Sequence, residues 1–231
     1  SSFLEKNSLH ELGTEKFVYF PLQVDPDRNL LIGSPYLTNQ IETIRNIVKS
    51  LPIDYKLFVK EHPGQQREWR DISFYKNIIE IPNVRLIHPS VPSEKIYKKC
   101  SLVITSGGSS GFEAAFFGKP TIVFSDTIYN RLASVSKVAN FDELPLTISN
   151  SLNKEITPED LDKFLIFLEK HSMDFDFFGY FFLEKKEFFH DAVLIDVKLN
   201  ENHVKTFLQK QSELFDILGK ELIKEIKSRK I

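Results

Sequence analysis

The sequence is poor in the features that mark several large classes of protein. Among its 231 residues there is one cysteine, Cys100, which excludes an internal disulfide framework and a CxxC metal site and fits a reducing cytoplasm. Its six histidines show no HExxH or comparable ligand spacing, so we expect no metal site and no cofactor. The formal net charge of −2 leaves no basic excess for binding a nucleic-acid backbone, so we expect no nucleic-acid partner.

The sequence also shows no pattern typical of a signal peptide or of a membrane-spanning helix. The first residues, SSFLEKNSLHELG, lack the basic start and apolar core of a signal peptide. The longest apolar run, 177–183, contains a glycine and is far shorter than the roughly 20 residues that span a bilayer. Because the chain does not begin with methionine, we expect it to be a piece of a longer protein. We therefore expect a cytoplasmic chain whose 42% hydrophobic content is enough for a folded core.

Short apolar runs alternate with amphipathic segments in the first part of the chain. The predicted strands are 17–22, 55–59, 84–87, 101–105 and 120–126. The predicted helices are 36–51, 93–100 and 109–118, the last ended by Gly118. This alternation predicts parallel strands joined by right-handed crossovers. We expect an α/β fold, a Rossmann-like doubly wound parallel sheet over residues 16–150, preceded by a lead-in at 1–15.

Long helical patterns with few strand signals dominate residues 151–231, which we predict to form a helical C-terminal extension. Thr157 and Pro158 are typical of a helix cap followed by a first turn. Apolar residues recur at helical spacing through 204–231.

An aromatic stretch, DFDFFGYFFLEKKEFF at 174–189, lies within this extension. On a helix, Phe178, Phe181, Phe182 and Phe189 would share one face. Such a face typically packs in a core or against another domain, here the domain absent from this chain. The alternative is a peripheral contact with the surface of the inner membrane. The sequence leaves both interpretations open.

Three loops with potential ligand groups follow predicted strands. They are KEHPG after 55–59, HPSVPS after 84–87, and TSGGSSGFE after 101–105. Ligands of an open parallel sheet bind outside the carboxyl ends of its strands, so we expect these loops to be neighbours in space.

The glycine-serine loop is the best candidate for an anion site. Gly107 and Gly108 permit positive φ and a close approach of the backbone to a ligand. Ser109 or Ser110 can cap the following helix and leave N–H groups and hydroxyls for a phosphate, with Ser106 beside them. An ordinary capped helix start is the alternative. The loop has neither the GxxxxGK[ST] nor the GxGxxG spacing, which argues against a P-loop and a nicotinamide site.

Four further side chains are substrate-binding candidates. The Glu113 carboxylate can accept hydrogen bonds from both hydroxyls of a ribose. The alternative is an ordinary solvated glutamate in the first turn of the helix, stabilised by the helix dipole. His62 is held in an extended backbone by Pro63 and can donate to a phosphate oxygen, with Lys60 adding charge; the alternative is a surface histidine in a turn. His88 repeats the His-Pro pattern one strand later and is the weaker candidate.

These motifs carry a resemblance. FVYFPLQVDPD, KEHPG and TSGGSSGFEAAFFGKP together resemble the bacterial capsule polysaccharide biosynthesis glycosyltransferases, which include Kdo-transferring enzymes. The histidine-proline motif and the serine pair are also similar to those of bacterial sialyltransferases and polysialyltransferases, and all these families share cytidine nucleotide donors. The resemblance covers about residues 17–130. It implies the nucleotide-binding C-terminal half of a GT-B fold, with the other half as partner.

The resemblance implies a glycosyltransferase that moves a sugar from a nucleotide-activated donor, CMP-linked Kdo or sialic acid, to a glycan acceptor. It implies that His62 is the catalytic residue holding the donor phosphate, that Ser109 and Ser110 bind the same phosphate, and that Glu113 binds the ribose. The backbone near 87–88 would frame the base, and 21–23 would face the cleft between the two halves. The absence of a DxD motif agrees with catalysis without metal.

Two other functions remain open at this point. A UDP-sugar epimerase would share the fold, and GKP before a strand occurs in UDP-GlcNAc 2-epimerases as well as in GT-B enzymes. A non-catalytic nucleotide- or protein-binding module is the second alternative, with the aromatic stretch as its docking surface.

Overall fold

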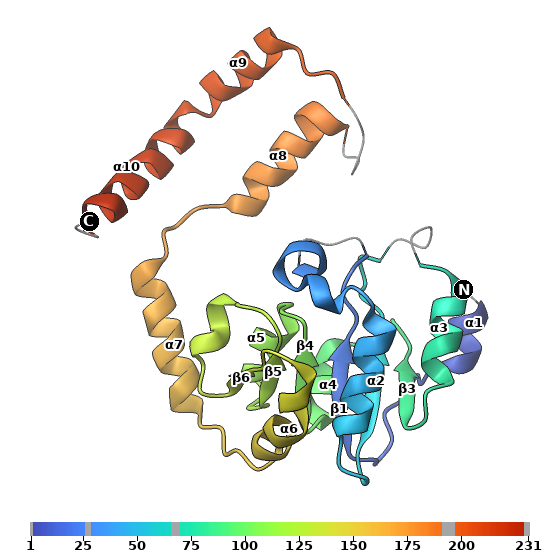
Figure 1. The fold of residues 1–231 in the computed structure, drawn as a ribbon. Helices are drawn as coiled ribbons and strands as arrows, with labels where there is room; N and C mark the ends of the chain where they lie inside the picture. The colour runs from blue at the N-terminus through green and yellow to red at the C-terminus, as the bar shows by residue number, and fades with distance from the viewer. Residues whose placement is uncertain (1, 26–28, 66–69, 191–196, 229–231) are drawn as a thin grey trace. The chain divides into compact units, whose positions relative to one another are not determined.

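The computed structural model describes residues 2–25, 29–65, 70–190 and 197–228 (Figure 1). The chain forms two compact units, Ser1–Ile166 and Phe167–Ile231. The division falls inside helix α7 (Pro158–His171), further along the chain than the predicted boundary at residue 150.

The first unit is built on a six-stranded sheet whose strands pair in parallel throughout. The strands are β1 (Phe17–Pro21), β2 (Lys56–Lys60), β3 (Val84–Ile87), β4 (Leu102–Thr105), β5 (Thr121–Val123) and β6 (Val135–Lys137). Their order, β3-β2-β1-β4-β5-β6, is that of a doubly wound Rossmann-like sheet, so the predicted fold class is confirmed. From β1 the chain adds β2 and β3 on one side of the sheet and then β4, β5 and β6 on the other. The switch point lies between β1 and β4, where such sheets bind ligands.

Helices precede, connect and follow these strands. They are α1 (Ser2–Asn7), α2 (Gln40–Ser50), α3 (Ile72–Ile79), α4 (Ser93–Lys99), α5 (Ser110–Ala115) and α6 (Leu144–Leu152), together with the shorter turns η1 (Asn29–Gly33), η2 (Pro35–Leu37), η4 (Ile128–Arg131) and η5 (Phe141–Glu143). Helix α2 begins later than predicted because a 3-10 turn occupies its expected start. Asn39 then caps it by accepting from the Glu42 N–H at 3.2 Å. After α5, Gly118 adopts φ +62°, as its predicted role at a helix end requires.

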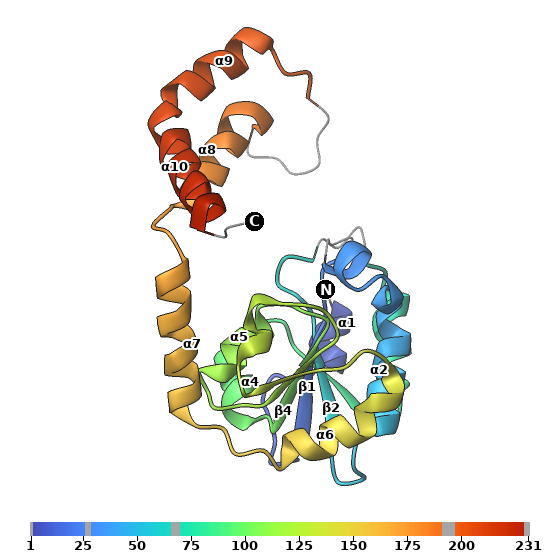
Figure 2. The same cartoon turned by 60° about the vertical axis from the view of Figure 1, so that its left-hand side comes forward.

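Alternate side chains of the central strand enter two separate cores. Val18 and Phe20 of β1 pack with α2, α3 and α6 on one face, while Phe17 and Tyr19 pack with α4 and α5 on the other. Figure 2 shows α2 and α6 on one side of the sheet and α4 and α5 on the other. Every residue of β1 is buried, which is the pattern of a parallel strand covered on both faces.

The second unit consists of helices α8 (Phe177–Phe189), α9 (Glu201–Lys210) and α10 (Ser212–Ser228). Within the described residues, the apolar pattern that begins at residue 204 falls on two helices, with Gln211 between them. Tyr180 and Phe188 of α8 pack against Phe207 of α9.

Three of the four residues of the predicted aromatic face of α8 are exposed, and the fourth, Phe189, is half-buried. Phe178, Phe181 and Phe182 are 69%, 45% and 58% exposed, respectively. Among the described residues, no helix combines the length and apolar character needed to cross a membrane.

Candidate functional site

A cavity of about 410 Å³ lies where β1, β2 and β4 end, between α4 and α5. This is the switch point of the sheet, where the ligands of doubly wound folds bind. The lining residues are Tyr19, Pro21, Leu22, Gln23, Lys60, Glu61, His62, Pro63, Ser93, Tyr97, Gly108, Ser109, Ser110 and Glu113.

The cavity gathers most of the residues predicted from the sequence. All three predicted loops contribute to it: the KEHPG loop after β2, the HPSVPS loop after β3 through its last residue Ser93, and the glycine-serine loop after β4, together with residues 21–23. The candidates brought together are Lys60, His62, Gly108, Ser109, Ser110 and Glu113.

Three predicted candidates lie outside this lining. Ser106 is buried beneath the loop, and its carbonyl accepts a hydrogen bond from the Ser125 hydroxyl. Gly107 turns the backbone at φ +155°. His88 packs against the lead-in segment, where its ring stacks on His10.

Lys60 is a buried cation that faces the cavity. It shares the face of Phe58 two residues earlier on β2, which is the face covered by α4 and α5. The residue is 5% exposed, and its Nζ lies 3.3 Å from Ser93 Oγ. Burial lowers the pKa of Lys60, and the Glu113 carboxylate acts in the opposite direction. Among the described residues no carboxylate lies within ion-pair distance of Nζ, so the ammonium retains donors for an anion in the cavity.

Glu113 is fixed by two hydroxyl groups. Its Oε1 accepts from Ser109 Oγ at 2.8 Å and its Oε2 accepts from Tyr97 Oη at 3.0 Å. Burial, followed by the charges of Tyr19 and Glu113, raises the pKa of Tyr97, so this phenol stays protonated and donates. Each carboxylate oxygen retains a further lone pair for a ligand hydroxyl.

The expected capping role of the serine pair is wrong. Ser109 occupies the position before α5, but its φ and ψ of −59° and −22° are already helical and its side chain makes no capping hydrogen bond. The Ser109 hydroxyl instead donates to the Glu113 carboxylate one turn later. A charged carboxylate is a stronger hydrogen-bond acceptor than a neutral group. The serine at this position orients the glutamate.

His62 is exposed at the mouth of the cavity. Its Nδ1 accepts from the Gly64 N–H at 3.0 Å, so the neutral imidazole carries its proton on Nε2. This tautomer offers one N–H donor, as the predicted contact with a phosphate oxygen requires.

A buried ion-pair network adjoins the cavity, and no local sequence pattern predicts it. Glu61 accepts from Arg70 Nη1 at 2.7 Å with both carboxylate oxygens and from Tyr75 Oη at 2.6 Å. Arg70 also donates through Nη2 to the Gln23 carbonyl at 2.8 Å. The network therefore ties the ends of β1 and β2 to α3.

Gln23 is held in turn by the side-chain amide of Gln40. The Gln23 N–H donates to Gln40 Oε1 at 2.8 Å, and Gln40 Nε2 donates back to the Gln23 carbonyl at 3.0 Å. The Gln23 side chain lies so close to Gly108 that a Cβ there would come within 3.0 Å of Oε1. The close backbone approach predicted for Gly108 is thus made to a protein side chain.

Replacing Gly107 with alanine should destabilise the first unit by about 2–3 kcal/mol. A Cβ at this position would lie 2.0 Å from Ser125 Oγ, and the residue would keep the unfavourable φ of +155°. Gly118→Ala is the matched control, because it has φ +62° and open space around its Cβ, and it should cost about 1 kcal/mol. Urea denaturation measures both values. Equal costs for the two variants would contradict the predicted clash.

Several solved structures are similar to this chain. The UDP-GlcNAc 2-epimerase from Methanocaldococcus jannaschii matches 68% of this chain and 43% of its own, at 18% identity and a TM-score of 0.47. The beta Kdo 2,7 transferase KpsC from Thermosulfurimonas dismutans matches 59% of this chain and 42% of its own, at 20% identity and a TM-score of 0.44. The S. aureus MnaA–UDP co-structure matches 61% and 38%, at 19% identity and a TM-score of 0.44.

The match thus spans less than half the length of each of these structures. A comparison with curated protein sequences found no match. A family model described as "Capsule polysaccharide biosynthesis protein" matches residues 4–136. This range contains β1 to β5 and every residue of the cavity lining. The chain belongs to the family of capsule polysaccharide biosynthesis proteins.

Proposed function

We propose that this chain is the donor-binding half of a GT-B glycosyltransferase that acts in capsule or surface polysaccharide synthesis. The observation that carries the proposal is the buried Lys60 ammonium. It faces the switch-point cavity and has N–H donors that are not used by Ser93. Ser110 and the Nε2–H of His62 line the same cavity, while the one hydroxyl proton of Ser109 is donated to Glu113. Such a set of donors suits the phosphate of an activated sugar.

The proposed reaction requires the protein to position the donor and to stabilise negative charge on its phosphate. As the bond between the sugar and the nucleotide phosphate breaks, negative charge builds up on the phosphate oxygens. Lys60 and His62 would stabilise that charge with donors that are already in place before the reaction. The acceptor glycan and the base that takes its proton would come from the other half of the enzyme, and no step needs a metal ion.

We propose a cytidine nucleotide, as in CMP-linked Kdo or sialic acid, as the donor. The support is the resemblance of the sequence motifs to enzymes with cytidine donors. Glu113 would bind the ribose hydroxyls, since Ser109 and Tyr97 hold its carboxylate in one orientation at the cavity. We further place the enzyme in the cytoplasm, with the exposed aromatic face of α8 as its contact with the membrane or with the other half.

A nucleotide panel tests this proposal. We expect CMP at millimolar concentration to raise the Tm of the chain more than CDP, UDP or GDP. A ligand at a hundred times its Kd stabilises the folded state by about 2.7 kcal/mol, which corresponds to a Tm rise of roughly 5–10 °C for a unit of this size. The shift should disappear in His62→Ala and persist in His203→Ala, a histidine of the second unit.

The other outcomes are equally informative. A shift with UDP alone would contradict the cytidine donor and favour a UDP-sugar transferase or an epimerase. If none of the nucleotides shifts the Tm, this chain does not form the donor site by itself, and the donor-binding assignment of the cavity fails.

A further inference from the structure

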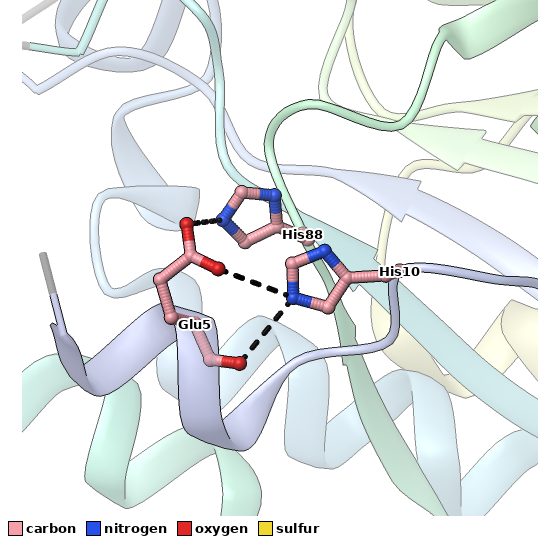
Figure 3. A group of neighbouring side chains, drawn as sticks. All are labelled: Glu5, His10 and His88. Atoms are coloured by element: carbon pink, nitrogen blue, oxygen red, sulfur yellow. Dashed lines mark hydrogen bonds and ion pairs between the residues drawn. The ribbon is translucent and has the colours of Figure 1, made fainter.

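A second group of chemically active side chains lies outside the cavity lining, at the β3 edge of the sheet. Glu5 comes from α1, His10 from the segment after it, and His88 from the end of β3. Figure 3 shows the Glu5 carboxylate facing both imidazole rings. Each residue offers one ligand atom, and the three atoms lie within 4.8 Å of one another.

Backbone pairing brings these residues together although they are far apart in sequence. Leu9 forms a parallel bridge with Ile87, in which the Leu9 N–H donates to the Leu86 carbonyl at 2.8 Å and the His88 N–H donates to the Leu9 carbonyl at 2.9 Å. In a parallel bridge the next residues of the two segments are also neighbours on the same face. His10 and His88 are those next residues, and their rings stack with centroids 4.2 Å apart.

We propose that Glu5, His10 and His88 form a binding site for Zn²⁺. Glu5 Oε1 lies 3.2 Å from His88 Nε2, and Glu5 Oε2 lies 3.5 Å from His10 Nε2. Ligand atoms of a tetrahedral zinc ion with bonds of about 2.0–2.2 Å are separated by about 3.3–3.6 Å. Both distances are close to this range, but they end on different oxygens of Glu5. The half-exposed His10 side chain must therefore rotate for one carboxylate oxygen and both imidazole nitrogens to bind the same ion.

The donor set selects the class of metal. Two imidazole nitrogens and one carboxylate suit zinc and its transition-metal neighbours, whereas Mg²⁺ and Ca²⁺ prefer oxygen ligands throughout. Three protein ligands leave a fourth position for water.

The surroundings of His88 support the assignment. Its Nδ1 lies 2.7 Å from Ser90 Oγ, which is the outer contact that orients a metal-binding histidine. Nδ1 also accepts from the Ser90 N–H at 3.3 Å, so binding of the ion at Nε2 moves the ring proton to Nδ1 and replaces this bond with one donated to the Ser90 hydroxyl. The ring itself is held on the sheet edge, with its side chain 14% exposed. The ion would fasten the lead-in helix to the sheet.

Zinc titration of the chain without a polyhistidine tag, after removal of metals with EDTA, tests the site. We expect one Zn²⁺ per chain by calorimetry and a Tm rise of about 5 °C at a hundredfold excess over Kd, while MgCl₂ at the same concentration has no effect. His10→Ala and Glu5→Gln should each weaken Zn²⁺ binding by about 100-fold or more, and Ser90→Ala by about 10-fold.

Both ligand variants should fold, because the Glu5 and His10 side chains are 59% and 48% exposed, and their Tm in EDTA checks this. The matched control is His203→Ala. His203 also faces a glutamate, with Nε2 2.7 Å from Glu187 Oε1, but belongs to no three-ligand group among the described residues. This variant should bind Zn²⁺ as the wild type does. No zinc-dependent Tm rise in the wild type, or a rise that survives in His10→Ala, would overturn the proposal.

Discussion

Replacing Lys60 with methionine should weaken nucleotide binding by about 100-fold, or roughly 2.7 kcal/mol at 25 °C, without destabilising the protein. The ammonium is the one buried cation among the described residues that line the cavity, so the variant leaves a ligand phosphate without its charged partner. Methionine occupies a similar volume and carries no charge. Calorimetric titration with the nucleotide that gives the largest Tm shift measures the loss of affinity.

The sign of the stability effect separates a binding role from a structural one. Burial lowers the pKa of Lys60, which means that the folded state holds the ammonium less favourably than the unfolded state does. The residue therefore opposes folding below its folded-state pKa, and this unfavourable contribution is relieved as the pH rises from that pKa toward the unfolded value. At neutral pH we expect the free energy of unfolding of Lys60→Met to be equal to or above that of the wild type.

Lys56→Met is the matched control for this prediction. Lys56 begins the same strand at the opposite end of the sheet, where its Nζ lies 3.6 Å from Glu15 Oε1. The same substitution there should leave nucleotide affinity unchanged. Affinity of Lys60→Met within threefold of the wild-type value would show that the ammonium does not face the phosphate. A marked loss of stability would show instead that Lys60 holds the fold together.

The fold could be predicted from the sequence because its central strands are short, apolar and regularly spaced. Parallel strands buried on both faces read as continuous apolar runs, as 17–22 and 101–105 do. Strand β6 was missed because its three residues are Val135, Ser136 and Lys137, of which only the first is buried. The break between α9 and α10 at Gln211 was missed because the apolar spacing runs through it without a glycine or proline.

The loop positions of the site were predictable for a topological reason, since the carboxyl ends of neighbouring parallel strands must meet. Lys60, His62 and Glu113 were found in this way. The contacts that hold them were not. Tyr97 on α4 donates to Glu113 on α5, and no spacing rule connects the surfaces of two helices that are separated by a strand.

The buried ion pair escaped the sequence analysis for a similar reason. Glutamate and arginine are mostly surface residues and are rarely buried unless they are paired, so the sequence predicts exposed positions for Glu61 and Arg70. Their pairing depends on how α3 packs beside β2, which is a tertiary property. The same applies to the histidines at the sheet edge, because the bridge between Leu9 and Ile87 has no counterpart in local sequence.

Replacing Arg70 with methionine should lower the free energy of unfolding by about 3–5 kcal/mol, as removal of one partner from a buried ion pair does. The Arg70 and Glu61 side chains are 2% and 9% exposed, so water cannot take the place of the missing guanidinium. Glu61 would keep the Tyr75 hydroxyl and the His62 N–H as donors, and both are neutral. Urea denaturation measures the loss.

Two further variants distinguish the buried pair from a general effect of removing an arginine. Arg45→Met removes an exposed arginine whose Nη1 lies 3.5 Å from Glu42 Oε2, and it should change stability by less than about 0.5 kcal/mol. Arg70 also pairs with Asp25, which is 35% exposed, so adding Glu61→Gln to Arg70→Met removes the more deeply buried of the two unpaired carboxylates. The double variant should therefore be more stable than Arg70→Met alone. A loss below about 1 kcal/mol in Arg70→Met would contradict the prediction. Because Arg70 also holds the Gln23 carbonyl, the stability of the fold and the shape of the cavity depend on the same guanidinium.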